Sequence, residues 1–188
     1  MKATATAHPI QGLIKYHGMR DPELRLPYHD SISVCTAPST TTTTVEFQPD
    51  AAADVYLIDG ERVEGRGAER IDAVVDHVRA RADVDHPVRL ESQNSFPSNI
   101  GFGSSASGFA AAATALATAA GLDLSRPELS TVARRGSASA ARAVTGAFSH
   151  LHSGMNDADC RSERIETDLD DDLRVVAAHV PADKATEG

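Results

Sequence analysis

Residues 97–108 read Pro-Ser-Asn-Ile-Gly-Phe-Gly-Ser-Ser-Ala-Ser-Gly, and an alanine-rich segment follows them directly. Gly101 and Gly103 allow backbone N–H groups to come close to a bound ligand. A helix expected over 106–120 would aim the positive end of its dipole at this loop. The stretch therefore predicts an anion site, with phosphate favoured over the alternative of a Gly-Ser turn that only caps a helix. Three hydroxyl groups able to cap the helix or to donate to phosphate oxygens belong to Ser104, Ser105 and Ser107.

The composition is that of an acidic globular chain. Its 188 residues suffice for one domain, and 41% of them are hydrophobic, although aromatic residues make up only 4% and Trp is absent. The formal net charge of −9 disfavours binding to nucleic acid or to anionic membranes. The chain holds 17 Asp and 10 Glu against 15 Arg and 3 Lys. This balance favours a halophilic protein from a salty cytoplasm, with a GC-rich genome as the alternative explanation.

The cysteines and the N-terminus indicate no special compartment. Cys35 and Cys160 are far apart and fit no Cys-x-x-Cys pattern, so we expect neither a metal site nor a disulfide framework. The first residues lack the apolar core of a signal peptide, and no apolar run approaches the length of a membrane span. We therefore expect a soluble cytoplasmic protein.

Strands and helices alternate along the chain. Asp59-Gly60 predicts a two-residue hairpin turn, and Ile71, Val74, Val75 and Val78 recur at helical spacing within 68–82. Ser125-Arg126-Pro127-Glu128 is typical of a capped helix start. Residues 11–21 and the acidic run 168–172 are expected to be loop and turn. Strands are expected over 2–8, 30–37, 40–47, 55–58, 61–64, 88–92, 147–152 and 173–180.

This order of elements predicts an α+β layered fold. Residues 1–180 would form one domain with a mixed sheet packed against helices. The tail 181–188 is loop-like and has no closing element, so we expect it to begin a link to a further domain that this chain does not contain.

Two more segments carry charged and small residues in unusual patterns. The first, Lys15-Tyr16-His17-Gly18-Met19-Arg20-Asp21, combines two cations with a glycine, although such charges usually lie on the surface. The second, Arg135-Gly136-Ser137-Ala138-Ser139-Ala140-Ala141-Arg142, leads from small residues to an arginine within a helical stretch. It favours either tight helix packing or a second anion site in which Arg142 holds a carboxylate or phosphate.

Together the three segments resemble the GHMP kinase superfamily, and within it the branch of mevalonate diphosphate and phosphomevalonate decarboxylases, including those of halophilic archaea. The segment 15–21 is similar to that branch's Lys-Tyr-Trp-Gly-Lys-Arg-Asp, and 135–142 to its Lys-Gly-Ser-Gly-Ser-Ala-Cys-Arg. Leu26-Pro27 and Ser31-Ile32-Ser33-Val34 also fall where the branch has them. The resemblance runs through the whole chain in order, and it implies a GHMP-type N-terminal domain followed in the family by a ferredoxin-like domain.

The resemblance implies an ATP-dependent enzyme of the mevalonate pathway of isoprenoid biosynthesis, with Mg²⁺ as a cofactor, and it allows a homodimer. Such enzymes phosphorylate the 3-hydroxyl of 5-phosphomevalonate or 5-diphosphomevalonate, then lose phosphate and carbon dioxide to give an isopentenyl phosphate ester. The alternatives are a small-molecule kinase of the same superfamily and an inactive nucleotide-binding fragment.

The resemblance also implies the site residues. Lys15 and Arg142 would act in catalysis, with Lys15 near the reacting hydroxyl and Arg142 on the substrate carboxylate. Substrate contacts would come from Tyr16, His17, Gly18, Met19, Arg70, Ser137, Ala138, Ser139, Ala140, Ala141, Arg142 and Thr186. ATP would be held by Pro97, Gly101, Gly103, Ser104, Ser105 and Ser107.

Departures from the family pattern sharpen this expectation. His17 stands in place of Trp, Ala141 in place of Cys, and Met19 in place of a Lys near the phosphate end of the substrate. Loss of that cation favours a substrate with less charge, 5-phosphomevalonate. The catalytic Asp of the family belongs to its C-terminal domain and has no match here, so we expect the 188 residues alone to be inactive.

Overall fold

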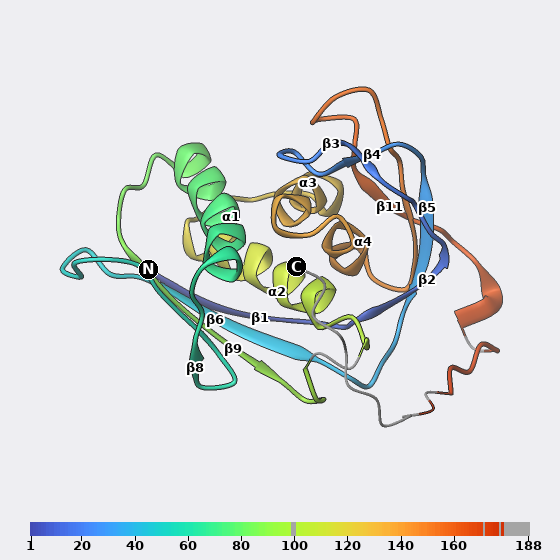
Figure 1. The fold of residues 1–188 in the computed structure, drawn as a ribbon, viewed down its shortest axis with the longest axis horizontal. Helices are drawn as coiled ribbons and strands as arrows, with labels where there is room; N and C mark the ends of the chain where they lie inside the picture. The colour runs from blue at the N-terminus through green and yellow to red at the C-terminus, as the bar shows by residue number, and fades with distance from the viewer. Residues whose placement is uncertain (99–100, 171, 177, 179–188) are drawn as a thin grey trace.

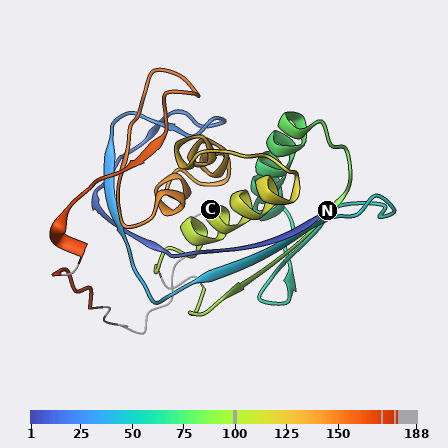
Figure 2. The same ribbon diagram turned by 180° about the vertical axis from the view of Figure 1, so that it is seen from behind.

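Two sheets diverge from each other, and the helices fill the concave side between them (Figure 1), as the view from behind also shows (Figure 2). The structure is a computed structural model that describes residues 1–98, 101–170, 172–176 and 178. The expected α+β fold is confirmed. Within these residues, no helix combines the length and the apolar character that crossing a membrane requires.

The larger sheet has five strands in the order β1-β6-β9-β7-β8. Its neighbours pair antiparallel except for β7 and β9, which run parallel. Alternate residues of β6 are buried, because β-branched Thr and Val side chains suit a sheet with one face on the core. The strands are β1 (Lys2–Ala7), β6 (Thr41–Phe47), β7 (Val55–Ile58), β8 (Glu61–Arg62) and β9 (Val88–Asn94).

The predicted hairpin joins β7 and β8. Asp59 and Gly60 have φ angles of 52° and 86°, and a two-residue turn that matches the twist of its strands needs positive φ at both positions. The turn brings Asp59 beside the end of β9, where its backbone N–H donates to the carbonyl of Ser92 at 2.9 Å. The hairpin therefore ends next to the segment that leads into the Gly-Ser loop.

The second sheet has four strands in the order β11-β10-β5-β2, and a short pair β3-β4 lies apart. The expected strands 30–37 and 147–152 are confirmed with shorter bounds. The strands β4 and β11 had no sequence prediction. The bounds are β2 (Ile10–Ile14), β3 (Met19–Asp21), β4 (Leu26–Pro27), β5 (Ser31–Cys35), β10 (Phe148–Leu151) and β11 (Ser162–Arg164).

The prediction of a loop over 11–21 is confirmed for 15–18 and wrong for 11–14 and 19–21, which lie in β2 and β3. Ile10 pairs with Cys35 and Gly12 with Ser33, so this polar stretch supplies an edge strand to β5. Met19 pairs with Pro27 in the small β3-β4 ladder. The local signal is weak because polar residues and glycines are poor strand formers, and the pairing is made by a segment more than 15 residues away in the chain.

In the described part of the chain, four α-helices cover the sheets. In α1 the predicted residues Ile71, Val74, Val75 and Val78 are buried. The helix α2 packs on β1 and β6 with one side and on α3 and α4 with the other, so its many alanines let the backbones approach closely. The bounds are α1 (Arg66–Ala82), α2 (Ser104–Ala119), α3 (Arg126–Gly136) and α4 (Ala140–Thr145).

The segment after β11 contains little regular structure. The acidic run begins with a 3₁₀ turn, η1 (Asp168–Asp170), in agreement with the expected turn. The strand expected over 173–180 is wrong for 173–176 and 178, which form no strand. Its other positions, and the tail 181–188, lie outside the described residues.

Candidate active site

The Gly-Ser loop leads directly into α2. Gly103 precedes the helix with φ 85°, and a Cβ at this position would lie a tight 3.2 Å from the carbonyl oxygen of Ile10, so both the backbone conformation and the space favour glycine. The first turn of α2 carries no acidic residue, so the helix does not neutralise the positive end of its own dipole there. The geometry leaves this helix end suited to an anion.

The three serines of the motif have different surroundings. Ser105 is exposed and Ser104 is half-buried. The hydroxyl of Ser107 is fully buried and shares a 2.6 Å hydrogen bond with the hydroxyl of Thr41. Ser107 therefore ties α2 to β6, while Ser104 and Ser105 remain open to a ligand.

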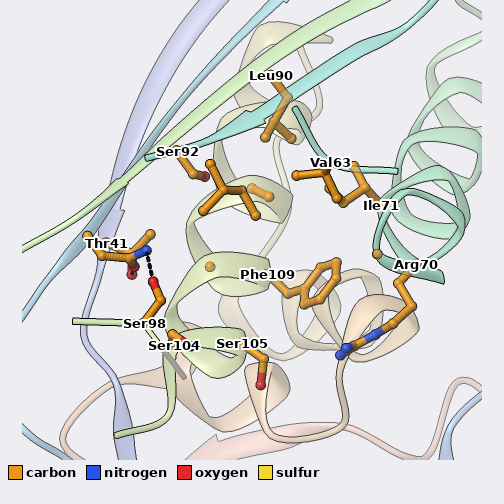
Figure 3. A pocket seen from close by; sticks show the side chains of 15 residues that line it. Thr41, Val63, Arg70, Ile71, Leu90, Ser92, Ser98, Ser104, Ser105 and Phe109 are labelled. Atoms are coloured by element: carbon orange, nitrogen blue, oxygen red, sulfur yellow. Dashed lines mark hydrogen bonds between the residues drawn. The ribbon is translucent and has the colours of Figure 1, made fainter. Parts of the chain in front are cut away.

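A cavity of about 450 Å³ lies behind the loop, between α1, α2 and the larger sheet. In Figure 3, Leu90, Val63 and Ile71 surround one end, while Ser104 and Ser105 lie at the other. This combination of an apolar end and a hydroxyl-lined end suits a ligand with a flat apolar part and a polar or charged part.

A polar network shapes the sheet side of this cavity. The side-chain amide of Asn94 donates to Asp59 at 2.9 Å, and the hydroxyl of Ser98 donates to the same carboxylate at 3.1 Å. Partial burial alone would raise the pKa of Asp59, but these hydrogen bonds hold it below its usual value. The hairpin turn thus positions Asn94 and Ser98 at the cavity wall, a role that the sequence analysis did not identify.

The segment 137–142 spans the junction of two helices rather than a continuous helix: residues 137–139 break the helix, and the residues from Ala140 belong to α4. α3 ends at Gly136, and Ser137 has an extended backbone. The hydroxyls of Ser137 and Ser139 lie 2.8 Å apart in a hydrogen bond, and α4 begins at Ala140. The break therefore presents two adjacent hydroxyls beside the start of α4, where Ala138, Ala140 and Ala141 are buried.

Arg142 is buried with only 4% of its surface exposed, yet its Nε and Nη1 atoms have no hydrogen-bond partner among the described residues. Its guanidinium lies 5.5 Å from the centre of the Tyr16 ring. Burial lowers the pKa of Arg142 and raises that of Tyr16, while the attraction between the two groups opposes both shifts. A buried cation with free donors predicts a bound anion, because charged donors are otherwise paired.

Arg70 connects this break to the cavity. Its Nε and Nη2 atoms donate to the carbonyl of Gly136 at 3.0 and 2.8 Å, and its guanidinium lies 4.8 Å from the centre of the Phe109 ring. Gly136 has no room for a side chain, since a Cβ there would overlap the Phe109 ring. Arg70 and Phe109 both line the cavity (Figure 3), so the two predicted ligand sites adjoin.

Two further arginines, missed by the sequence analysis, enlarge this cationic region. The Nε atom of Arg25 donates to the carbonyl of Arg135 at 2.8 Å. Burial lowers the pKa of Arg70, and the positive charges of Arg25 and Arg66 lower it further. The Arg within Leu24-Arg25-Leu26 is visible in the sequence, but only the fold brings it near Arg70.

The segment 15–19 lies at the surface of this region. Lys15 is exposed, and a Cβ on Gly12 would lie 3.1 Å from its Cγ atom, so its side chain folds back over β2. Gly18 has φ 74° and passes close to the Tyr28 ring. His17 is exposed and Met19 is half-buried in β3. Through Tyr16 this segment reaches Arg142.

The remaining expected residues divide into two groups. Pro97 and Gly101 are exposed positions of the loop, and Gly101 has φ 81°. Thr186 lies outside the described residues. The structure thus brings together the loop, Arg70, the segment 137–142 and Tyr16, although these positions are spread over more than 120 residues of the chain.

The chain is similar to known proteins over most of its length. The family model of the diphosphomevalonate decarboxylase-like N-terminal domain matches residues 7–162. The chain is 82% identical over 187 residues to phosphomevalonate decarboxylase of Haloferax volcanii. The aligned region covers 100% of this chain and 58% of that relative.

Solved structures agree with this match. The mevalonate diphosphate decarboxylase from Enterococcus faecalis superposes with a TM-score of 0.83 at 37% identity, over 88% of this chain and 52% of that one. A structure described as MDDEF in complex with MVAPP, AMPPCP and magnesium superposes with a TM-score of 0.85 at 36% identity, over 90% and 52% of the two chains. The present chain therefore spans between half and three-fifths of the length of these relatives.

Proposed function

The chain belongs to the diphosphomevalonate decarboxylase-like family, and from this premise we propose that it forms the ATP-binding and substrate-binding part of a phosphomevalonate decarboxylase. The reaction transfers the γ-phosphoryl group of ATP to the 3-hydroxyl of 5-phosphomevalonate. The C3–O bond then breaks as phosphate leaves, and the electrons of the C1–C2 bond form the new double bond as carbon dioxide departs. The product is an isopentenyl phosphate ester.

One observation carries this proposal: beside the Tyr16 ring, the buried guanidinium of Arg142 has donors without a partner in the part of the chain that the structure describes. A carboxylate bound there would accept charge-assisted hydrogen bonds from Arg142 donors that have no partner among the described residues. The hydroxyls of Ser137 and Ser139 share a 2.8 Å hydrogen bond, and the hydroxyl that accepts this bond would be free to donate to the same substrate. Arg142 would thus fix the carboxyl group that is lost as carbon dioxide.

The cavity behind the Gly-Ser loop suits ATP. Its apolar end would take the base, and the exposed end of α2 would take the phosphates. Ser104 and Ser105 are open to the phosphates or to Mg²⁺, whose preferred ligands are oxygens, whereas the hydroxyl of Ser107 already bonds to Thr41 and would position the helix. When bound, the metal ion supplies charge neutralisation for phosphoryl transfer.

Arg70 and Lys15 would serve the charged ends of the reacting pair. Arg70 lies between the cavity and the segment 137–142, so its charge acts on the phosphate groups of either ligand. Lys15 would approach the 3-hydroxyl from the surface side. The uncharged Met19 favours 5-phosphomevalonate over the diphosphate, and the similarity to the Haloferax volcanii enzyme supports the same choice.

The proposal extends to the whole protein. Residues 1–180 would form the first domain, and 181–188 would begin the link to a second one. A cytoplasmic location and a homodimer remain predictions from the family resemblance. We expect the 188 residues by themselves to bind both ligands and to release little carbon dioxide, because the catalytic Asp implied by the resemblance has no match among them.

Ligand binding and product analysis test this function. Calorimetry on the 188-residue chain should detect 5-phosphomevalonate and a non-hydrolysable ATP analogue, and an Arg62→Ala variant on the exposed β8 should bind both equally well. The full-length protein with ATP and Mg²⁺ should release carbon dioxide from 5-phosphomevalonate. A phosphorylated product without carbon dioxide would instead establish a kinase, and no binding of either ligand would refute the proposal.

A further inference from the structure

A cluster of two histidines and one aspartate lies on the second sheet, outside the site described above. One ligand atom from each of Asp30, His150 and His152 can be chosen so that all three lie within 4.8 Å of one another. The Nε2 atom of His150 is 2.8 Å from Oδ2 of Asp30, and the Nδ1 atom of His152 is 3.9 Å from the same oxygen. The two imidazole rings have centroids 4.0 Å apart.

The fold brings these groups together from two distant parts of the chain. His150 belongs to β10 and pairs with Ile32 of β5, which places it next to Asp30, the residue that precedes β5. His152 follows β10, and its backbone N–H donates to the carbonyl of Arg161 at 3.1 Å. The cluster therefore depends on the β5-β10-β11 pairing rather than on one flexible loop.

The cluster faces away from the proposed substrate site. Side chains alternate along β10, so His150 points to the face opposite that of Leu151. Leu151 is fully buried in the cluster that contains Ala141, the neighbour of Arg142 on α4. The histidines thus lie on the outer face of the sheet, where His150 is 30% and His152 41% exposed.

Hydrogen bonds and a nearby carboxylate fix the orientation of Asp30 and His152, as the neighbours of metal ligands do in known metal sites. Oδ1 of Asp30 accepts hydrogen bonds from the backbone N–H and the hydroxyl of Ser153, at 2.7 and 2.8 Å, which leaves Oδ2 directed at the histidines. The Nε2 atom of His152 lies 3.6 Å from a carboxylate oxygen of Glu163. A carboxylate on the far nitrogen of a ligand histidine fixes its ring orientation and raises its basicity.

From this geometry we propose that Asp30, His150 and His152 form a binding site for one divalent transition-metal ion, with Zn²⁺ as the expected occupant and Glu163 as the outer partner of His152. Metal–ligand bonds of about 2.0–2.2 Å place neighbouring ligand atoms about 3.0–3.6 Å apart. The separations of 2.8 and 3.9 Å from Oδ2 of Asp30 lie on either side of that range, and all three ligand atoms lie within 4.8 Å of one another, so binding requires side-chain rotations that bring them into that range.

The donor set decides the class of ion. Imidazole nitrogens with one carboxylate suit Zn²⁺ and its neighbours in the first transition row, whereas Mg²⁺ prefers oxygen ligands alone. The site is therefore distinct from the Mg²⁺ expected with ATP. A bound ion would tie the start of β5 to the end of β10, and it would stabilise the folded chain by mass action.

The test uses the untagged 188-residue chain, treated with a chelator and then titrated with ZnCl₂ alone in a calorimeter. The wild-type chain should bind one equivalent. His150→Ala and His152→Ala should each weaken binding by at least about tenfold, and Glu163→Gln should weaken it by about 10–100-fold. His86→Ala, which changes a histidine outside the cluster, is the matched control and should bind like the wild type.

A second readout separates metal binding from any change in folding. ZnCl₂ should raise the Tm of the wild-type and His86→Ala chains and leave the Tm of His152→Ala unchanged. Substituted Co²⁺ should give visible absorption bands in the wild type that are lost in His152→Ala. A folded wild-type chain that binds no stoichiometric Zn²⁺, or a His152→Ala chain that binds it as tightly as the wild type, would overturn the proposal.

Discussion

Replacing Arg142 by Met should stabilise the free protein and weaken its binding of substrate. The guanidinium is 4% exposed, and two of its nitrogen atoms lack partners among the described residues. Arg134 is its natural comparison, since it is fully buried and donates to the carbonyls of Leu24 and Cys160 and to Asp157. One buried arginine is therefore satisfied by the fold, and the other is not.

The expected magnitudes follow from this difference. Each buried donor without a partner destabilises the fold by about 1–3 kcal/mol, and the contact of Arg142 with the Tyr16 ring returns up to about 2 kcal/mol. The two donors together cost about 2–6 kcal/mol, so with the ring contact subtracted Arg142→Met should raise the free energy of unfolding by up to about 4 kcal/mol. Loss of a buried charge-assisted contact with the substrate carboxylate should reduce the binding free energy by about 2–5 kcal/mol, which is about 30- to 4,000-fold in Kd.

Two measurements on the same variants check this reasoning. Urea denaturation of the free 188-residue chain, in concentrated KCl, gives the change in stability, and calorimetry with 5-phosphomevalonate gives the change in affinity. Arg134→Met is the control and should destabilise by about 3–5 kcal/mol, because it leaves buried carbonyls and Asp157 without their partner. If Arg142→Met destabilises as much as Arg134→Met and binds substrate normally, Arg142 is a structural residue and the assignment fails.

Three other variants test separate parts of the structure. Gly136→Ala should destabilise the protein by about 1–3 kcal/mol and weaken binding of an ATP analogue, because the new Cβ displaces Phe109 from the cavity wall. Gly108→Ala, whose Cβ has free space, should be at least as stable as the wild type in urea denaturation. Met19→Lys should raise kcat/KM of the full-length enzyme for 5-diphosphomevalonate relative to kcat/KM for 5-phosphomevalonate. An unchanged ratio would show that this position does not distinguish the two substrates. Partial burial alone would raise the pKa of Asp157, but two arginines hold it below its usual value. The contribution of Asp157 to stability is therefore complete above the unfolded pKa of about 3.9 and is lost as the pH falls through the lower folded pKa. Asp157→Asn should therefore be less stable than the wild type at neutral pH and lose less stability on acidification, as urea denaturation across this pH range would measure; identical acid profiles would exclude Asp157 as a source of the acid sensitivity.

Local patterns were sufficient for most elements of the larger sheet and for the longer helices. The spacing of Ile71, Val74 and Val78 predicted α1, and Asp59-Gly60 predicted the β7-β8 turn, because each signal is contained within one element. The failures are elements that exist through distant partners. The edge strand β2 depends on β5, and β11 depends on β10, so neither stands out from its own residues.

The sequence by itself determined the Gly-Ser loop before α2 and the family to which the chain is similar, because these depend on which residues follow one another. Tertiary structure alone decided which polar groups are paired. Arg134 and Arg142 both sit among small residues eight positions apart, yet distant carbonyls satisfy only the first. The pairing of β5 with β10 likewise brings Asp30 to His150, 120 residues further along the chain. Hydrogen bonding and metal binding depend on distances in space, and the order of residues does not specify those distances.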